Sequence, residues 1–129
     1  MLDTNIVSEL VHRPAGLVAQ RLGRHGPDGL CVSIVAAGEI RFGAAKRNSA
    51  RLTKQIDVVL SGLPILPIGT PVERQYGALR VALETTGTLI GPNDLWIAAH
   101  ALTLGVTLVT HNLTEFRRVP GLTVESWLE

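Results

Sequence analysis

Short apolar runs alternate with amphipathic stretches along the whole chain, as in α/β domains. β-branched or leucine-rich runs predict strands at Met1–Leu2, Leu30–Val35, Ile65–Ile68 and Val106–Val109, with an edge strand at Leu122–Val124. Helical spacing of apolar residues predicts helices over Ile6–Val11, Leu17–Leu22, Ala36–Lys46, Ala50–Leu60, Pro71–Thr85 and Asn93–Leu104. The pattern therefore predicts an α/β fold with three layers, in which helices enclose a short central parallel sheet.

Proline, glycine and small polar residues predict where several of these helices begin and end. Pro14 is expected to start the second helix, and Gly23 and Gly26 to close it. Thr70 is expected to cap the fifth helix, with Pro71 at its first position and Glu73 three residues after the cap. Only two residues precede Asp3, so the first strand should be very short.

Composition limits the class of protein. The 129 residues are 46% hydrophobic and 18% charged, which fits a single domain over residues 1–129 and excludes intrinsic disorder. The one cysteine, Cys31, excludes an internal disulfide framework and a cysteine-rich zinc site. No apolar run reaches the roughly 18 residues that a bilayer span needs. We expect a cytoplasmic globular protein with no membrane contact.

Three of the eleven acidic residues fall at places where a doubly wound sheet binds ligands. Asp3 follows the first strand, Glu39 lies early in the helix after the second long strand, and Asp94 opens the helix before the third. The carboxyl ends of parallel strands form the ligand crevice of such folds, so topology places Asp3 and Glu39 there. Asp94 joins them on the inference that its helix begins at the same rim. Structural roles are the alternatives: Asp3 as a helix cap, and Asp94 as an acid that stabilises the helix dipole. A structural role explains Glu39 less well, because it lies in an otherwise apolar run and a buried lone carboxylate is costly.

Three carboxylates on one rim repel one another unless a cation lies between them. Oxygen-only ligands select hard ions such as Mg²⁺ or Mn²⁺. The four histidines lack the spacing of a zinc site, and the chain shows no serine or cysteine nucleophile set and no phosphate-binding glycine loop. Metal-assisted hydrolysis is the remaining chemistry, with Asp3 and Asp94 holding the ion directly and Glu39 directly or through water.

An ordered set of motifs resembles the VapC-type PIN-domain toxins of type II toxin–antitoxin pairs. The set comprises Leu2–Ile6, Ser33, Glu39, Gly91–Ala101, Val109–Asn112 and Phe116. The resemblance covers the chain from Met1 to about Trp127 and implies a PIN-domain fold and a metal-dependent endoribonuclease. Asp3, Glu39 and Asp94 match the family's acidic metal-binding positions. Asn112 matches a fourth catalytic position that many members fill with Asp, so a second metal is less expected than the first.

The same resemblance implies further residues and partners. Thr4, Asn5, Ser33 and Thr110 lie beside the acids in the sequence and are expected to hydrogen-bond around them. The implied substrate is structured RNA, a tRNA or a ribosomal RNA loop, and the implied partner is a VapB-type antitoxin. A homodimer is also expected, with DNA bound only indirectly through the antitoxin.

The charge balance supports a polyanionic substrate. If a metal neutralises the three site acids, the chain has twelve basic residues and eight remaining acidic ones, a net charge of +4. The candidate phosphate contacts are Arg13, Arg41, Lys46, Arg47 and Arg80, for each of which a solvated helix face is an equally weighted alternative.

Two other classes of function stay open at this point. The first is a weakly catalytic or non-catalytic partner of a DNA-binding antitoxin that acts in operator binding and autoregulation. The second is a phosphotransferase of the haloacid dehalogenase type, but that chemistry needs a second acid where Asn5 stands.

Overall fold

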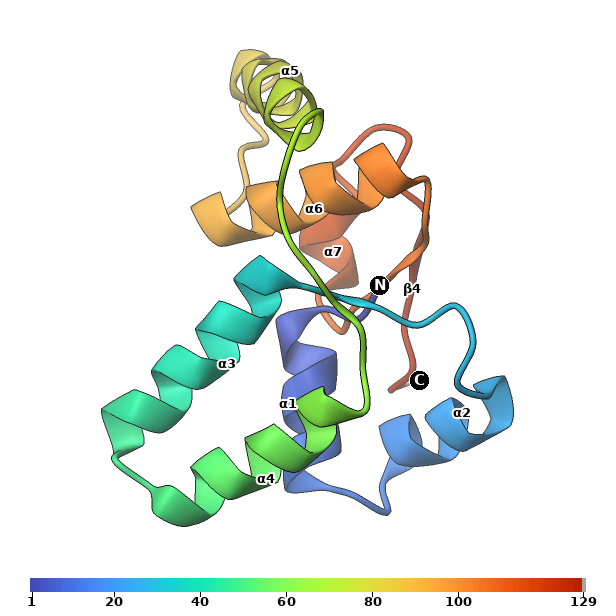
Figure 1. The fold of residues 1–129 in the computed structure, drawn as a ribbon. Helices are drawn as coiled ribbons and strands as arrows, with labels where there is room; N and C mark the ends of the chain where they lie inside the picture. Colours follow the sequence, from blue (N-terminus) through green and yellow to red (C-terminus); the bar gives the residue numbers. More distant parts are fainter. Residues whose placement is uncertain (129) are drawn as a thin grey trace.

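The computed structural model describes residues 1–128. The helices are α1 (Thr4–His12), α2 (Leu17–His25), α3 (Ile34–Arg47), α4 (Ala50–Ser61), α5 (Val72–Thr85), α6 (Pro92–Leu104) and α7 (Leu113–Phe116). The strands are β1 (Val32–Ser33), β2 (Ile65–Leu66), β3 (Leu108–Val109) and β4 (Val124–Glu125). In Figure 1, α1 to α4 occupy one half of the molecule and α5 to α7 the other, with the strand region between them.

Leu2 joins the short strands into one parallel arrangement. It bridges Val32 of β1 on one side and Val109 of β3 on the other, and β2 and β4 pair parallel with β1 and β3. The spatial order is therefore β2, β1, Leu2, β3, β4, so the chain first winds to one side of Leu2 and then to the other. This reversal is the topological switch point of a doubly wound sheet, and Asp3 is the next residue.

The core explains why so short a sheet is stable. Leu2, Val32 and Leu108 are completely buried in the sheet, and the helices add Ile6 and Phe116, which are also fully buried. Cys31 is buried as a free thiol and belongs to this core. Among residues 1–128 no helix is long and apolar enough to cross a membrane.

Several predicted boundaries were wrong, and the strands were all predicted too long. Ile34 and Val35 belong to α3 rather than to a strand, because the Ser33 hydroxyl accepts a hydrogen bond from the Val35 N–H and begins the helix there. The strands predicted at 65–68 and 106–109 are only two residues long in the structure, at Ile65–Leu66 and Leu108–Val109. The last strand lies at Val124–Glu125 rather than Leu122–Val124.

The predicted start of α2 at Leu17 is confirmed, but the roles given to Pro14 and Thr70 at helix starts were wrong. Gly16, not Pro14, precedes α2, and that helix continues through Gly23 to His25. Pro71 occupies the cap position of α5, so Thr70 does not cap the helix, and the Val72 N–H bonds the Gly69 carbonyl instead of a capping side chain. The ends of α4 and α6 agree closely with the prediction, and Gly105 closes α6 in the left-handed conformation that glycine allows.

Candidate active site

Asp3 lies at the switch point and is held by its neighbours on both sides. Its main chain pairs with β3 through a hydrogen bond from Asp3 N–H to Val109 O, and its carboxylate caps α1 by accepting from Thr4 N–H at 2.8 Å. The second carboxylate oxygen accepts from Thr110 Oγ1 at 2.8 Å and from Asn5 Nδ2 at 3.3 Å. Asp3 therefore caps α1 and also lies in the candidate site, so the two roles do not exclude each other.

Burial determines the electrostatics of Asp3. The residue is only 2% exposed. Burial raises the pKa of Asp3 above its ordinary value, the hydrogen bonds from Thr110 and Thr4 partly offset that rise, and the charges of Glu39 and Glu115 add to it. The carboxylate of Asp3 is thus fixed by three hydrogen bonds and is acted on by the negative charges of Glu39 and Glu115.

Glu39 lies in the second turn of α3 and connects three helices. Its Oε1 accepts from Thr4 Oγ1 on α1 at 2.7 Å, and its Oε2 accepts from Asn93 Nδ2 on α6 at 3.3 Å. The side chain is half-buried rather than buried, so the argument from a costly buried carboxylate was wrong in its premise. Its two hydrogen bonds nevertheless direct it towards the first turns of α1 and α6.

Asp94 lies in the first turn of α6, which begins at the same rim. Its pKa is raised to about 7, first by burial, then by its hydrogen bond to Glu115 and by the charges of Glu115, Asp3 and Glu39. The four carboxylates are therefore close enough to act on one another. Burial and the neighbouring carboxylates therefore favour the protonated form of Asp94.

Glu115, on α7, is a member of this group that the sequence reasoning missed. Its Oε1 accepts from the Gly91 N–H at 3.0 Å, and its Oε2 accepts from Asn112 Nδ2. Burial acts to raise the pKa of Glu115, but the hydrogen bonds from Gly91, Asp94 and Asn112 and the charge of Arg118 outweigh it, so the pKa is lowered. A sequence signal existed, because Asn112 and Glu115 have the three-residue spacing of a capping box.

Glu115 changes the interpretation of Asn112. Asn112 adds no charge itself, but its side chain holds Glu115 and its N–H donates to Thr110 Oγ1 at 3.0 Å. Glu115 therefore supplies the negative charge that an Asp would provide at position 112.

The predicted hydrogen-bonding neighbours divide into two groups. Thr4, Asn5 and Thr110 bond the acids directly, and Asn5 Oδ1 also accepts from the His111 N–H at 3.0 Å. The hydroxyl of Ser33 forms its hydrogen bonds elsewhere than with the acids. Its hydroxyl bonds the buried His100 Nδ1 at 2.9 Å, which ties the start of α3 to α6, and burial lowers the pKa of His100.

Most of the predicted phosphate contacts have carboxylate partners nearby. Arg13 pairs with Glu9 on α1, Arg41 with Asp57 on α4, and Arg80 with Glu84 on α5. All three pairs are exposed, so they contribute little to stability and leave the guanidinium groups accessible. Lys46 is exposed on α3, and Arg47, one residue further, lines a pocket beside the acids.

The donor chemistry fits a hard divalent cation. All four acids offer oxygen, and within residues 1–128 no basic side chain forms an ion pair with Asp3, Glu39 or Asp94. Over the same residues, no three His, Cys, Asp or Glu side chains are grouped so as to hold an ion by themselves. That arrangement suits Mg²⁺, which keeps several waters and usually takes only one or two carboxylates directly.

Comparison with known proteins agrees with this fold. Residues 1–122 match the PIN domain family. The chain is 34% identical to Ribonuclease VapC2 of Rickettsia felis over 98% of this chain and 96% of that protein. It is 32% identical to the tRNA(fMet)-specific endonuclease VapC of Salmonella typhimurium over the same shares. The chain therefore belongs to the PIN-domain family, in its VapC branch.

Solved structures extend the likeness to three dimensions. The VapBC2 complex from Rickettsia felis, bound to a DNA fragment from its promoter, superposes with a TM-score of 0.91 at 34% identity and covers 98% of this chain and 97% of that chain. VapBC-1 from nontypeable Haemophilus influenzae gives a TM-score of 0.85 at 32% identity, covering 100% and 98%. The predicted PIN-domain fold with a short parallel sheet is confirmed.

Proposed function

We propose that this protein is a metal-dependent endoribonuclease and the toxin of a VapBC-type toxin–antitoxin pair. The observation that carries the proposal is the group of carboxylates at the switch point, whose charges act on Asp94 and of which Asp3, Glu39 and Asp94 form no ion pair with a basic side chain in the described part of the chain. Curated VapC proteins with the same fold are named ribonucleases, and one of them is named for cleavage of tRNA(fMet). We propose a tRNA or a ribosomal RNA loop as the substrate.

The side chains take distinct roles in this proposal. Asp3 and Asp94 hold Mg²⁺ or Mn²⁺, and Glu39 completes the site directly or through water. When bound, such an ion supplies an activated water and offsets the charge that develops on the phosphate. Asn112 belongs to the catalytic group because it holds Glu115 in place. Thr110, Asn5 and Thr4 keep Asp3 and Glu39 in fixed orientations, so little reorganisation is needed when the phosphate arrives.

The proposed partners come from the same relatives. VapC chains in the solved structures lie in complexes named VapBC, so we propose a VapB-type antitoxin as the inhibitor of this protein. We also propose a single domain over residues 1–129, a homodimer, and contact with DNA only through the antitoxin. Of the exposed cations, Arg13, Arg41, Lys46, Arg47 and Arg80 remain candidates for phosphate contacts.

A second candidate function has one observation in its favour. The Rickettsia felis complex was solved on a fragment of its own promoter. A protein of this shape can therefore act in operator binding through its antitoxin, with or without a nuclease activity of its own.

Cleavage of a mixed RNA pool separates the two candidates. Purified protein, free of antitoxin, is incubated with total tRNA and rRNA in Mg²⁺, in Mn²⁺ and in EDTA, beside Asp94→Asn and the matched surface control Asp28→Asn. We expect discrete fragments with wild type and Asp28→Asn, and none with Asp94→Asn or in EDTA. If folded, metal-loaded wild type leaves both pools intact, the operator-binding function is the better account.

A further inference from the structure

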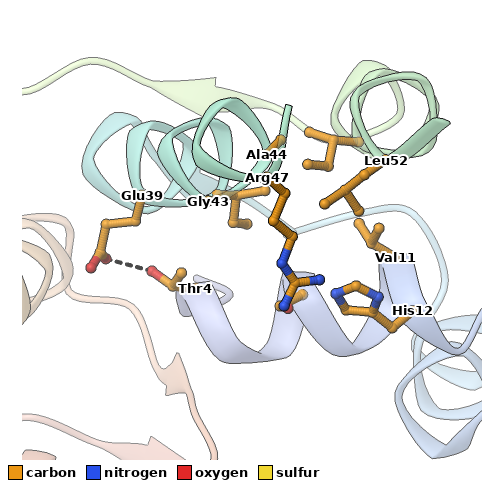
Figure 2. A pocket seen from close by; sticks show the side chains of 11 residues that line it. Thr4, Val11, His12, Glu39, Gly43, Ala44, Arg47 and Leu52 are labelled. Atoms are coloured by element: carbon orange, nitrogen blue, oxygen red, sulfur yellow. Dashed lines mark hydrogen bonds between the residues drawn. The ribbon is translucent and has the colours of Figure 1, made fainter. Parts of the chain in front are cut away.

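A pocket of about 170 Å³ opens directly beside the acids, between α1, α3 and α4. Its walls follow from helical spacing: Thr4 and Ser8 on α1, and Glu39, Gly43 and Arg47 on α3, recur every four residues and so share one face of each helix. Leu52 and Ile56 of α4 close the remaining side. Figure 2 shows Thr4 and Glu39 at one end of this pocket and Arg47 with His12 at the other.

The two ends of the pocket differ in chemistry from its middle. The middle is apolar, with Val11, Ile40 and Ala44 among its lining residues. One end is the acid site itself, where Thr4 donates to Glu39. At the other end, the side chains of His12 and Arg47 make no hydrogen bond or ion pair within residues 1–128, and Figure 2 shows them next to each other at the pocket. An apolar hollow with a few polar groups is the usual form of a ligand site.

We infer that this pocket binds a nucleobase of the RNA next to the phosphate that the acids attack, with Arg47 contacting a phosphate beyond that base. The inference rests on the proposed function, since it needs RNA at the acid site. The size is suitable for one flat ring, because an engineered cavity of about 150 Å³ takes up benzene. Because Thr4 and Glu39 line both the acid site and the pocket, a strand bound at the acids can extend over the pocket mouth.

The position of the Arg47 side chain favours a nucleic acid strand over an isolated apolar group as the ligand of this pocket. Arg47 lies eight residues after Glu39 on one helix, about 12 Å further along its axis. A strand that begins at the acid site therefore meets an apolar hollow and then a guanidinium group, in the order base and phosphate. A side chain from a protein partner is the other candidate occupant, and a pocket used only by such a partner would show no base preference in the experiment below.

Two glycines of α3 provide a matched pair of variants. A Cβ at either Gly43 or Gly38 meets no atom within 4 Å, so a larger residue can be placed at both positions without a clash at that atom. Gly43 lines the pocket and Gly38 does not. Gly43→Leu should therefore fill the pocket, whereas Gly38→Leu adds the same side chain to the same helix outside it.

Binding of short RNA tests the pocket separately from cleavage. The probes are a fluorescent uridine hexanucleotide and the same sugar–phosphate strand without bases, measured by anisotropy with Ca²⁺ present to neutralise the carboxylates. Wild type and Gly38→Leu should bind the strand with bases about tenfold more tightly than the abasic strand, as expected from base contacts elsewhere. Gly43→Leu should bind both strands equally, and Arg47→Ala should reduce the log–log salt slope by about 0.7.

The outcomes separate this inference from the proposed function. Equal binding of both strands by wild type, or an unchanged base preference in Gly43→Leu, overturns the inference even if wild type cleaves RNA. A base preference that disappears only in Gly43→Leu upholds it, whether or not cleavage is seen in the mixed pool. Circular dichroism of both leucine variants establishes that each is folded as wild type before binding is compared.

Discussion

Replacing Asp94 by Asn should make the metal-free protein more stable while it removes activity. The folded-state pKa of about 7 lies above the ordinary value of 3.8 because burial and three neighbouring carboxylates disfavour the charged form. The stabilising contribution of protonated Asp94 is therefore complete below about pH 4 and is lost as the pH rises through 7. At about 1.36 kcal/mol for each pH unit between the two values, the upper limit is roughly 4 kcal/mol.

The expected gain is smaller, because Asp94 is half-buried and solvent screens its charge. We expect Asp94→Asn to raise the free energy of unfolding by about 1–2 kcal/mol at pH 8 in EDTA, and by close to zero at pH 4. Urea unfolding of wild type and variant at both pH values measures the difference. A variant that is no more stable than wild type at pH 8, or whose gain is the same at pH 4, would refute the electrostatic account.

Magnesium should reverse this order of stability. An ion present at 100 times its Kd stabilises a protein that binds it by about 2.7 kcal/mol. Wild type should gain stability of this kind when Mg²⁺ replaces EDTA, and Asp94→Asn should gain much less. A variant that gains as much as wild type would show that Asp94 does not contribute to the cation site.

The remaining predictions concern other parts of the structure. Glu115→Gln should lower the cleavage rate at least tenfold in an RNA cleavage assay, whereas Glu73→Gln, on the exposed first turn of α5, should leave it unchanged; equal rates would remove Glu115 from the site. Leu2→Ala empties the centre of the sheet and should cost about 3 kcal/mol in urea unfolding, with a loss below 1 kcal/mol contradicting the topology. Ser33→Ala removes the α3 cap and the partner of His100, and should cost about 1–3 kcal/mol by the same measurement; a neutral result would argue against that link. Cleavage should weaken with salt by a log–log slope near −0.7 per phosphate contacted, and salt-independent cleavage would refute the phosphate contacts.

The long elements were predictable because periodicity and terminal residues agree in them. Ala50 and Gly105 mark the predicted ends of α4 and α6, and the structure places them there. The ends of the strands were not predictable, because a two-residue strand in the core has the same apolar composition as the helix that follows it. Ile34 is the clearest case: its β-branched side chain favours a strand, but the hydroxyl of Ser33 begins a helix at that residue.

The site was predictable where topology alone places a residue. Asp3 and Glu39 follow strands, so the order of elements places them at the carboxyl edge of the sheet. Asp94 required the further inference that its helix begins at the same rim. Glu115 was missed because it lies on α7, a helix of four residues, and its approach to Asp94 depends on a loop that the hydrophobic pattern does not describe.

Cleavage of the tRNA and rRNA pool by the antitoxin-free protein, with and without Mg²⁺, tests the central claim most directly. The account predicts discrete fragments in Mg²⁺ that disappear when EDTA is added and return when Mg²⁺ is restored. Fragments that persist in EDTA, or that Asp94→Asn produces at the wild-type rate, would contradict the claim that the carboxylates around Asp3 form a cation-dependent nuclease site.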